Sequence, residues 1–288
     1  MIYVFKTKKS SNKFLQKFVR LKDHKDFENY EVEGEKYFNY KWKNFNYNMP
    51  KDVEFCFQGI IRGTHLLKPF MKTNRWYYFD KPYFYNTDYT AHKDFDTIWY
   101  RINVNNVQQN KIDNNPKHKE RYNNLIKISP KEIELLDWRK SGDHILVIPP
   151  SYHTAKWYEI SEIEWVKDTV RELKRYTDRE IRVRYKFKNG QKFGDKNDVP
   201  FNEDLKNCWA IVSWHSMCAS HAVRQGIPSF SSEHSPASPV SYKLNQLKYI
   251  EKPIMPDRDQ WMYSLLGSQF TLSEMNTGFA YKYINNEF

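Results

Sequence analysis

Hydroxyl-bearing residues directly follow a short apolar stretch in the C-terminal half of the chain. Residues 209–213 predict a buried strand that ends in Ser213, and a helix is expected to begin at Ser216 and to close at Gly226. Backbone N–H groups at the beginning of a helix, together with the helix dipole, attract anions. The two serines could therefore bind a phosphate group, or Ser216 could simply cap the helix, as serine does in many proteins.

Basic residues mark the end of a neighbouring predicted strand. Arg182, Arg184 and Lys186 alternate with other residues, so they share one face, and the last two lie at the carboxyl end. Arginine can bind a phosphate with two hydrogen bonds, and lysine adds a point charge. The same pattern fits a solvated edge strand. Ser151 follows the predicted strand 144–149 and supplies a hydroxyl at a third strand end.

Short apolar, β-rich stretches alternate with amphipathic ones along most of the chain. This alternation predicts an α/β protein with parallel sheets and crossover helices. The stretches 53–61, 76–80 and 98–104 indicate one sheet, a boundary is expected near 138–143, and four stretches from 144 to 230 indicate a second sheet. Ligands of such sheets bind beyond the carboxyl ends of the strands. We therefore expect two Rossmann-like lobes that face each other across a cleft.

Two blocks of the second predicted sheet carry a family resemblance. Residues 211–216, and then 222–228 with their Gly-Ile-Pro ending, resemble the nucleotide-sugar segment of glycosyltransferases of the GT-B fold. In those enzymes a strand meets a helix that begins at a serine. Further segments are similar to glycosyltransferase-like proteins of phages and bacteria, and these are 59–63, 76–80, 100–102, 257–261 and 269–275.

The resemblance implies an organisation and a donor site. It implies that residues 1–140 bind the acceptor, that 141–260 bind the nucleotide sugar, and that 261–288 form helices packing back on the first lobe. A UDP-sugar is the expected donor substrate, and no cofactor is expected. His221 stands where the family usually has an acidic residue for the donor ribose, and Glu233 could compensate. The expected donor-binding residues are Ser151, Arg184, Lys186, Ser213, His215, Ser216, His221, Glu233 and Ser235.

Catalytic candidates come from the first predicted sheet. An inverting transferase needs a carboxylate or an imidazole to take the proton of the acceptor hydroxyl. Asp80, at the carboxyl end of the stretch 76–80, is the first candidate base and His65 the second. Asp80 also fits an ordinary turn before Lys81. The expected acceptor-binding residues are Arg62, Gly63, Tyr83 and Arg101, whose two arginines could equally pair with carboxylates.

Metal-binding patterns are weak in this sequence. The Asp-X-Asp triplets 94–96 and 257–259 are of a kind that holds Mn²⁺ or Mg²⁺ in other transferases, but chance alone explains them among so many acidic residues. The second triplet suits the beginning of a helix. The histidines lack the paired spacing of a zinc site. We expect a metal-independent enzyme.

Charge and aromatic content bear on the acceptor. The net charge is +11, which favours a polyanionic partner or reflects an AT-rich coding sequence. Aromatic residues at 76–79 and 83–85 are interleaved with basic ones, which suits either stacking on an extruded base or a strand core. The favoured acceptor is a 5-hydroxymethyl pyrimidine in phage duplex DNA. The alternatives are a transferase of surface polysaccharide synthesis and a non-catalytic DNA-binding protein on the same fold.

The remaining expectations concern location and assembly. No apolar stretch approaches the roughly 18 residues of a membrane span. Cys56, Cys208 and Cys218 lack metal-ligand spacing and are expected to be reduced thiols. We expect a cytoplasmic monomer or weak dimer with no membrane partner, located in an infected bacterial host if the chain is phage-encoded.

Overall fold

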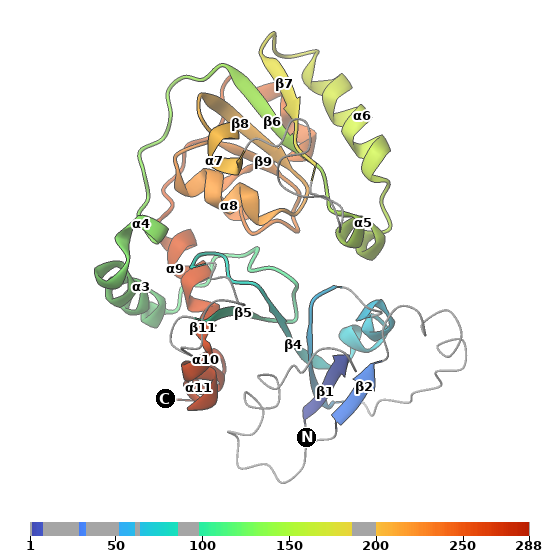
Figure 1. The fold of residues 1–288 in the computed structure, drawn as a ribbon, viewed down its shortest axis with the longest axis vertical. Helices are drawn as coiled ribbons and strands as arrows, with labels where there is room; N and C mark the ends of the chain where they lie inside the picture. The colour runs from blue at the N-terminus through green and yellow to red at the C-terminus, as the bar shows by residue number, and fades with distance from the viewer. Residues whose placement is uncertain are drawn as a thin grey trace. The chain divides into compact units, whose positions relative to one another are not determined.

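The computed structural model describes residues 2–7, 29–32, 52–60, 64–85, 98–185 and 200–287, which belong to two compact units. Unit 1 comprises Met1–Val107 and Leu266–Phe288, and unit 2 comprises Gln108–Leu265. Each unit contains one β-sheet with helices packed on it (Figure 1). None of the described helices has the length and apolar character that a membrane span requires.

Unit 1 is built on a six-stranded mixed sheet of order β11-β5-β4-β3-β1-β2. The strands β2, β1, β3 and β4 are mutually parallel, whereas β5 is antiparallel to both of its neighbours. The strands are β1 (Ile2–Thr7), β2 (Asn29–Val32), β3 (Glu54–Gln58), β4 (Arg75–Asp80), β5 (Trp99–Val104) and β11 (Gln269–Thr271).

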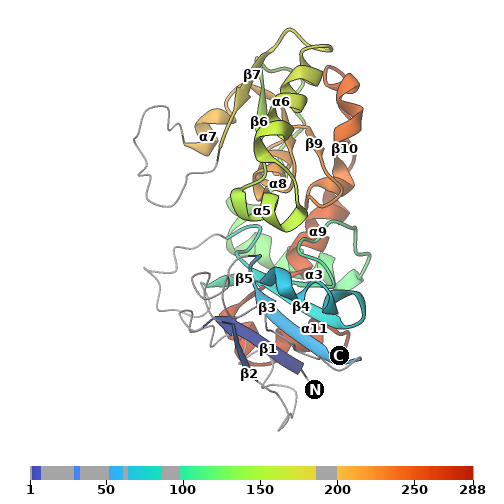
Figure 2. The ribbon, with the colours of Figure 1, turned by 90° about the vertical axis from the view of Figure 1, so that its right-hand side faces the viewer.

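Aromatic side chains fill the core of unit 1. Tyr77 and Phe79 of β4 pack with Phe270 and with the final helices α10 (Leu272–Asn276) and α11 (Phe279–Ile284). Figure 2 shows this helix pair behind the strands. On the other face, the ring centroids of Phe57 and Tyr78 are 5.5 Å apart. The aromatic stretch 76–79 is therefore a strand core, and these rings are covered rather than available to stack on a base.

Residues 64–72 form two short 3-10 turns, η2 (Thr64–Leu67) and η3 (Phe70–Lys72). Pro69 lies between them, and it provides no backbone N–H to continue a helical ladder. These turns connect β3 to β4.

Unit 2 contains a five-stranded sheet that is parallel throughout, of order β10-β9-β8-β6-β7. The first strand of the unit, β6, lies between the second and the third, so the strand order reverses between β6 and β8. This reversal is the topological switch point of an open parallel sheet. The strands are β6 (His144–Ile148), β7 (Glu180–Val183), β8 (Cys208–Ser213), β9 (Ser229–Ser231) and β10 (Tyr242–Lys243).

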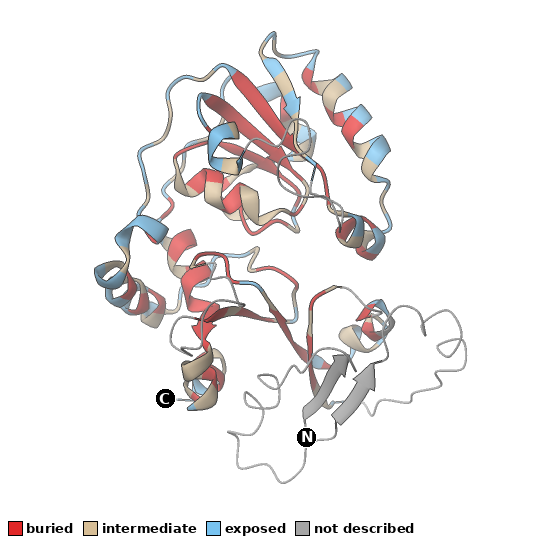
Figure 3. Cartoon of the chain, viewed as in Figure 1, coloured by how far each residue is buried: buried red, intermediate tan, exposed pale blue. Residues whose placement is uncertain are grey.

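Helices cover both faces of the unit 2 sheet. On one face α6 (Glu162–Leu173) and the 3-10 turns η5 (Leu244–Tyr249) pack on Val147 and Val212. On the other, α7 (Phe201–Asp204) and α8 (Met217–Arg224) pack on Leu146 and Ile211. Every residue of β6 and β8 is buried, as Figure 3 shows. The remaining helices are α3 (Pro116–Ile128), α4 (Pro130–Ile133), α5 (Tyr152–Tyr158) and α9 (Asp259–Gly267).

The units divide the chain at Val107 and Gln108, earlier than the expected boundary near 140. Residues 108–140 belong to unit 2 because the segment after α4 runs along the end of α8. The N–H of Leu136 donates to the carbonyl of Arg224 at 2.9 Å, and the N–H of Arg139 donates to that of Gly226 at 2.8 Å. Residues 266–288 belong to unit 1, where β11 extends the sheet by pairing with β5.

Gly226 makes this contact possible. Its φ of +77° lies in the left-handed region, and a Cβ there would stand 1.9 Å from the carbonyl oxygen of Asp137. We expect Gly226→Ala to lower the free energy of unfolding by about 3 kcal/mol, because conformational strain and overpacking add. Urea unfolding measures the change. Gln225→Ala, at the neighbouring position with φ −81°, is the control and should change it by less than about 0.5 kcal/mol. Equal stability of the two variants would contradict the packing.

Candidate functional site

Three serines lie at the carboxyl edge of β6 and β8. β6 ends at Ile148, which pairs in register with Ser213, the last residue of β8. Ser151 then caps α5, and Ser216 caps α8. Because ligands of open parallel sheets bind at the switch point, this edge is the candidate site of unit 2.

The serine hydroxyls organise the beginning of α8. Ser213 Oγ accepts a hydrogen bond from the N–H of Ser216 at 3.2 Å, and Ser216 Oγ accepts one from the N–H of Cys218 at 3.2 Å. A serine that accepts in this way still has its own hydroxyl hydrogen to donate. The expected cap is therefore present, and its geometry also suits an anion at the helix end.

Four rings gather beside these serines, and the sequence did not single out the tyrosine. Tyr158, at the end of α5, stacks on His234 with ring centroids 4.5 Å apart and 24° between the planes. Its ring centroid also lies 5.3 Å from that of His215 and 6.5 Å from that of Trp214. Burial raises the pKa of the Tyr158 phenol, so this hydroxyl stays protonated at neutral pH. No spacing pattern points to Tyr158; only the strand order brings it here.

The histidines and acidic residues of the expected donor site differ in their surroundings. His215 is buried, with Nδ1 3.3 Å from the Gln108 side-chain nitrogen. His221 is half-buried on α8. Glu233 is exposed, and its carboxylate lies 3.7 Å from His234 Nε2. Ser235 is fully buried, and its Oγ accepts a hydrogen bond from the N–H of Ala237.

The expected arginine of the donor site has an internal partner. Arg184 Nη1 contacts the carboxylate of Asp204 in α7, and the guanidinium lies 5.6 Å from the ring centroid of Phe201. Arg182 pairs with Glu180 on the surface. These contacts favour a structural role for Arg184, because its charge is already balanced. Lys186 lies outside the described residues.

Asp80 and Arg101 form a cross-strand ion pair in unit 1. The Asp80 carboxylate accepts hydrogen bonds from Arg101 Nη2 at 2.9 Å, from the Tyr78 hydroxyl at 2.6 Å and from the N–H of Lys81 at 2.8 Å. Burial alone would lower the pKa of Arg101, but Asp80 and the nearby tyrosines outweigh it and raise that pKa. The contacts of the Asp80 carboxylate with Arg101, Tyr78 and Lys81 favour a structural role for it.

The other expected residues of the first lobe are scattered. His65 is exposed on η2. Tyr83 is fully buried; its hydroxyl accepts a hydrogen bond from the Asn103 amide at 3.2 Å. Arg101 is buried beneath that ring, so neither residue presents a surface to an acceptor. Arg62 and Gly63 lie outside the described residues.

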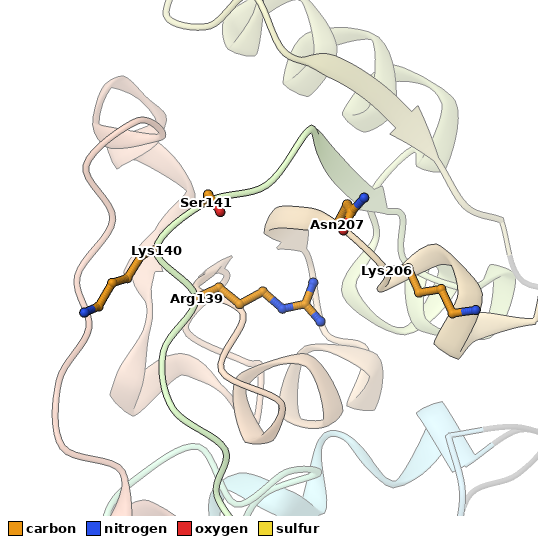
Figure 4. A pocket seen from close by; sticks show the side chains of 5 residues that line it. All are labelled: Arg139, Lys140, Ser141, Lys206 and Asn207. Carbon is orange, nitrogen blue, oxygen red and sulfur yellow. The ribbon is translucent and has the colours of Figure 1, made fainter.

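A basic pocket of about 480 Å³ lies at the opposite edge of the unit 2 sheet (Figure 4). Ser141 precedes β6, and Lys206 and Asn207 precede β8, so these residues mark the amino ends of the strands. The Arg139 guanidinium donates to the carbonyl of Cys208 at 3.2 Å. The Lys140 side chain points away from that of Arg139 (Figure 4). This shallow pocket is separate from the candidate site.

Metal-binding clusters are absent from the part of the chain that the structure describes: no three His, Cys, Asp or Glu side chains gather there. Asp257 Oδ1 accepts a hydrogen bond from the N–H of Asp259 at 3.0 Å, where α9 begins. The triplet 94–96 lies outside the described residues.

The sequence matches no protein-family model and no curated protein. Among solved structures it is similar to two transferases of Thermosulfurimonas dismutans. One is KpsC, beta Kdo 2,7 transferase, at 12% identity and a TM-score of 0.45 over 99% of each chain. The other is KpsC, beta Kdo 2,4 transferase, at 8% identity and a TM-score of 0.46, over 92% of this chain and 89% of that one. Likenesses below a TM-score of 0.5 carry no weight for the chemistry of this chain.

Asp80→Asn separates a structural carboxylate from a catalytic one. Because it leaves the buried Arg101 without its counter-charge, we expect the free energy of unfolding to fall by about 3 kcal/mol. Glu164→Gln, which breaks the exposed pair with Lys167, is the control and should cost under about 1 kcal/mol. Denaturant unfolding measures both. If Asp80→Asn kept full stability, the carboxylate would be available for another role.

Proposed function

We propose that this chain is a glycosyltransferase that binds a nucleotide-diphosphate sugar, such as a UDP-sugar, at the carboxyl edge of β6 and β8. One observation carries the proposal. The switch point of the unit 2 sheet coincides with Ser213 and Ser216, in the segment whose sequence resembles the nucleotide-sugar segment of GT-B glycosyltransferases. The strand order and the sequence pattern both indicate these same few residues.

The residues at this edge suit the parts of such a donor. The hydroxyls of Ser213 and Ser216 and the dipole of α8 can bind a diphosphate and stabilise its charge as it leaves, which requires no metal ion. The rings of Tyr158, Trp214 and His234 offer flat surfaces to a base or a sugar. Unit 1 would supply the acceptor site, as the resemblance implies.

The structure changes the balance between the acceptors. Besides charge, aromatic residues interleaved with basic ones favoured hydroxymethylated DNA, because they could stack on an extruded base. The described rings of 76–79 are buried, and Arg101 is paired inside the core. Arg75 and Lys81 lie at opposite ends of β4, so these two basic residues are not gathered in one place. We therefore place a saccharide hydroxyl first and hydroxymethylated DNA second, the latter supported by the net charge of +11.

A transfer assay tests the function and separates the acceptors. The full chain is incubated with a panel of nucleotide sugars and, in parallel, with bacterial surface oligosaccharides, hydroxymethylated DNA and plain DNA. Mass spectrometry then detects the added sugar. A gain on an oligosaccharide supports the first acceptor, and a gain only on hydroxymethylated DNA supports the second. Turnover of no donor with any acceptor, or salt-sensitive DNA binding alone, contradicts the proposal.

Ser216→Ala tests the donor site. Both Ser216 and Ser161 cap helices, and Ser161 Oγ accepts a hydrogen bond from the N–H of Glu164 at 3.3 Å. Loss of either cap should cost about 1 kcal/mol of stability. Only Ser216→Ala should weaken UDP binding, by roughly tenfold, because a hydrogen bond to a charged ligand is lost. The first turn of α6 carries Glu162 and Glu164, which repel an anion. Calorimetry showing the same UDP affinity in both variants would remove Ser216 from the site.

A further inference from the structure

Ser229 and Ser231 of β9 have their side chains on the face of the sheet that α8 covers. Phe230 between them packs on the opposite face of the sheet, with Val147 and Val212, so Ser229 and Ser231 share the face that α8 covers. They are 2% and 1% exposed. Neither hydroxyl has a hydrogen-bond partner among the residues that the structure describes.

Their positions along the strand distinguish these serines. Ser231 pairs in register with Ser213, whose hydroxyl accepts the N–H of Ser216, so the Ser231 side chain is directed toward the beginning of α8. Ser229 pairs with Ile211, further from the carboxyl edge. A buried hydroxyl without a partner costs free energy and is uncommon. A ligand at the beginning of α8 can supply the missing partner of the Ser231 hydroxyl. Ser229 lies further from that edge, so the same ligand does not account for its hydroxyl.

A second hydrogen-bond donor lies in the turn between β8 and α8. The indole Nε1 of Trp214 is covered and has no hydrogen-bond partner in the described part of the chain. Indole nitrogen can only donate a hydrogen bond. The turn 214–216 therefore offers an indole donor at the end of a helix whose dipole favours negative charge. A donor in this position suits an anion.

We infer that the Ser231 hydroxyl and the Trp214 indole N–H complete a diphosphate-binding site at the beginning of α8. The inference rests on the proposed function in taking the diphosphate of a nucleotide sugar as the natural ligand. Both donors are shielded from solvent in this structure, so the anion enters by a local opening of the turn 214–216. That turn is short, and the hydroxyl of Ser232 holds it through the carbonyl of Trp214.

Cys218 provides a reporter at this position. It is the second residue of α8 and is partly exposed, whereas Cys56 and Cys208 are fully buried. Burial raises the pKa of the Cys208 thiol to about 12 and that of Cys56 further still, so both resist alkylation. Iodoacetamide should therefore modify Cys218 alone in the folded protein. An anion bound beside it both shields the thiol and disfavours the thiolate, which slows the reaction.

Inorganic pyrophosphate is the probe, with the full chain and the matched variants Ser231→Ala and Ser229→Ala. Pyrophosphate should slow alkylation of Cys218 in the natural protein and equally in Ser229→Ala. In Ser231→Ala the pyrophosphate concentration needed for the same protection of Cys218 should rise by roughly ten- to a hundredfold. Trp214→Phe, which keeps an aromatic ring and loses the N–H, should shift it in the same direction. Calorimetric titration with pyrophosphate checks the affinities without the label.

The outcomes separate this inference from the proposed function. Equal protection in both serine variants, or no protection in the natural protein, overturns the diphosphate site. Thermal unfolding of the two variants shows whether a difference arises from stability instead, since both substitutions remove the same buried group. Ser231-dependent pyrophosphate binding without sugar transfer leaves the site standing and removes the transferase. Sugar transfer with Ser231-independent binding does the reverse.

Discussion

The parallel pairing of β6 with β8 is the constraint on which the candidate site depends. Every residue of both strands is buried, and a fully buried Val or Leu side chain stabilises the fold by about 1.5–3 kcal/mol. After β6 the chain crosses to β7 by α6 on one face, and after β8 it crosses to β9 by α8 on the other. The connections therefore diverge at the carboxyl edge, and the topology brings the residues between them, Ser151 and 214–216, to that same edge.

The two units use the same strand order without an evident sequence repeat. β2-β1-β3-β4 in unit 1 corresponds to β7-β6-β8-β9 in unit 2, and in each the first strand lies between the second and the third. Unit 1 then departs from the pattern, because β5 and β11 add to its edge with antiparallel pairings. Apolar stretches of a few residues suffice to specify each strand, so the same topology arises from unrelated side chains. The switch point of unit 1 lies between β1 and β3.

The sequence was informative where one stretch of residues decides the structure. The apolar residues of 144–148 and the serine before α8 act locally, so the strand and the cap could be predicted from them. Pairing between distant residues could not. Arg184 and Asp204 are separated by an intervening segment, and Asp80 meets Arg101 only because β5 runs antiparallel in that register. A charged residue at a strand end fits a ligand site and an internal ion pair equally well until its partner is known. Tyr158 was missed for the same reason, since its neighbours His215 and His234 lie on other loops.

These pairings shape how the protein can recognise an anion. Arg184 is balanced by Asp204, so the described residues at the carboxyl edge of β6 and β8 offer neutral donors, namely serine hydroxyls, an indole N–H and the end of a helix. Neutral donors gain strength from the exclusion of water and are little affected by salt. Binding through clustered surface cations weakens steeply as salt rises, because counterions are no longer released as favourably. A nucleotide sugar held at this edge should thus bind almost independently of ionic strength, even in a chain of net charge +11. Strong salt dependence would belong to a different surface and a polyanionic partner.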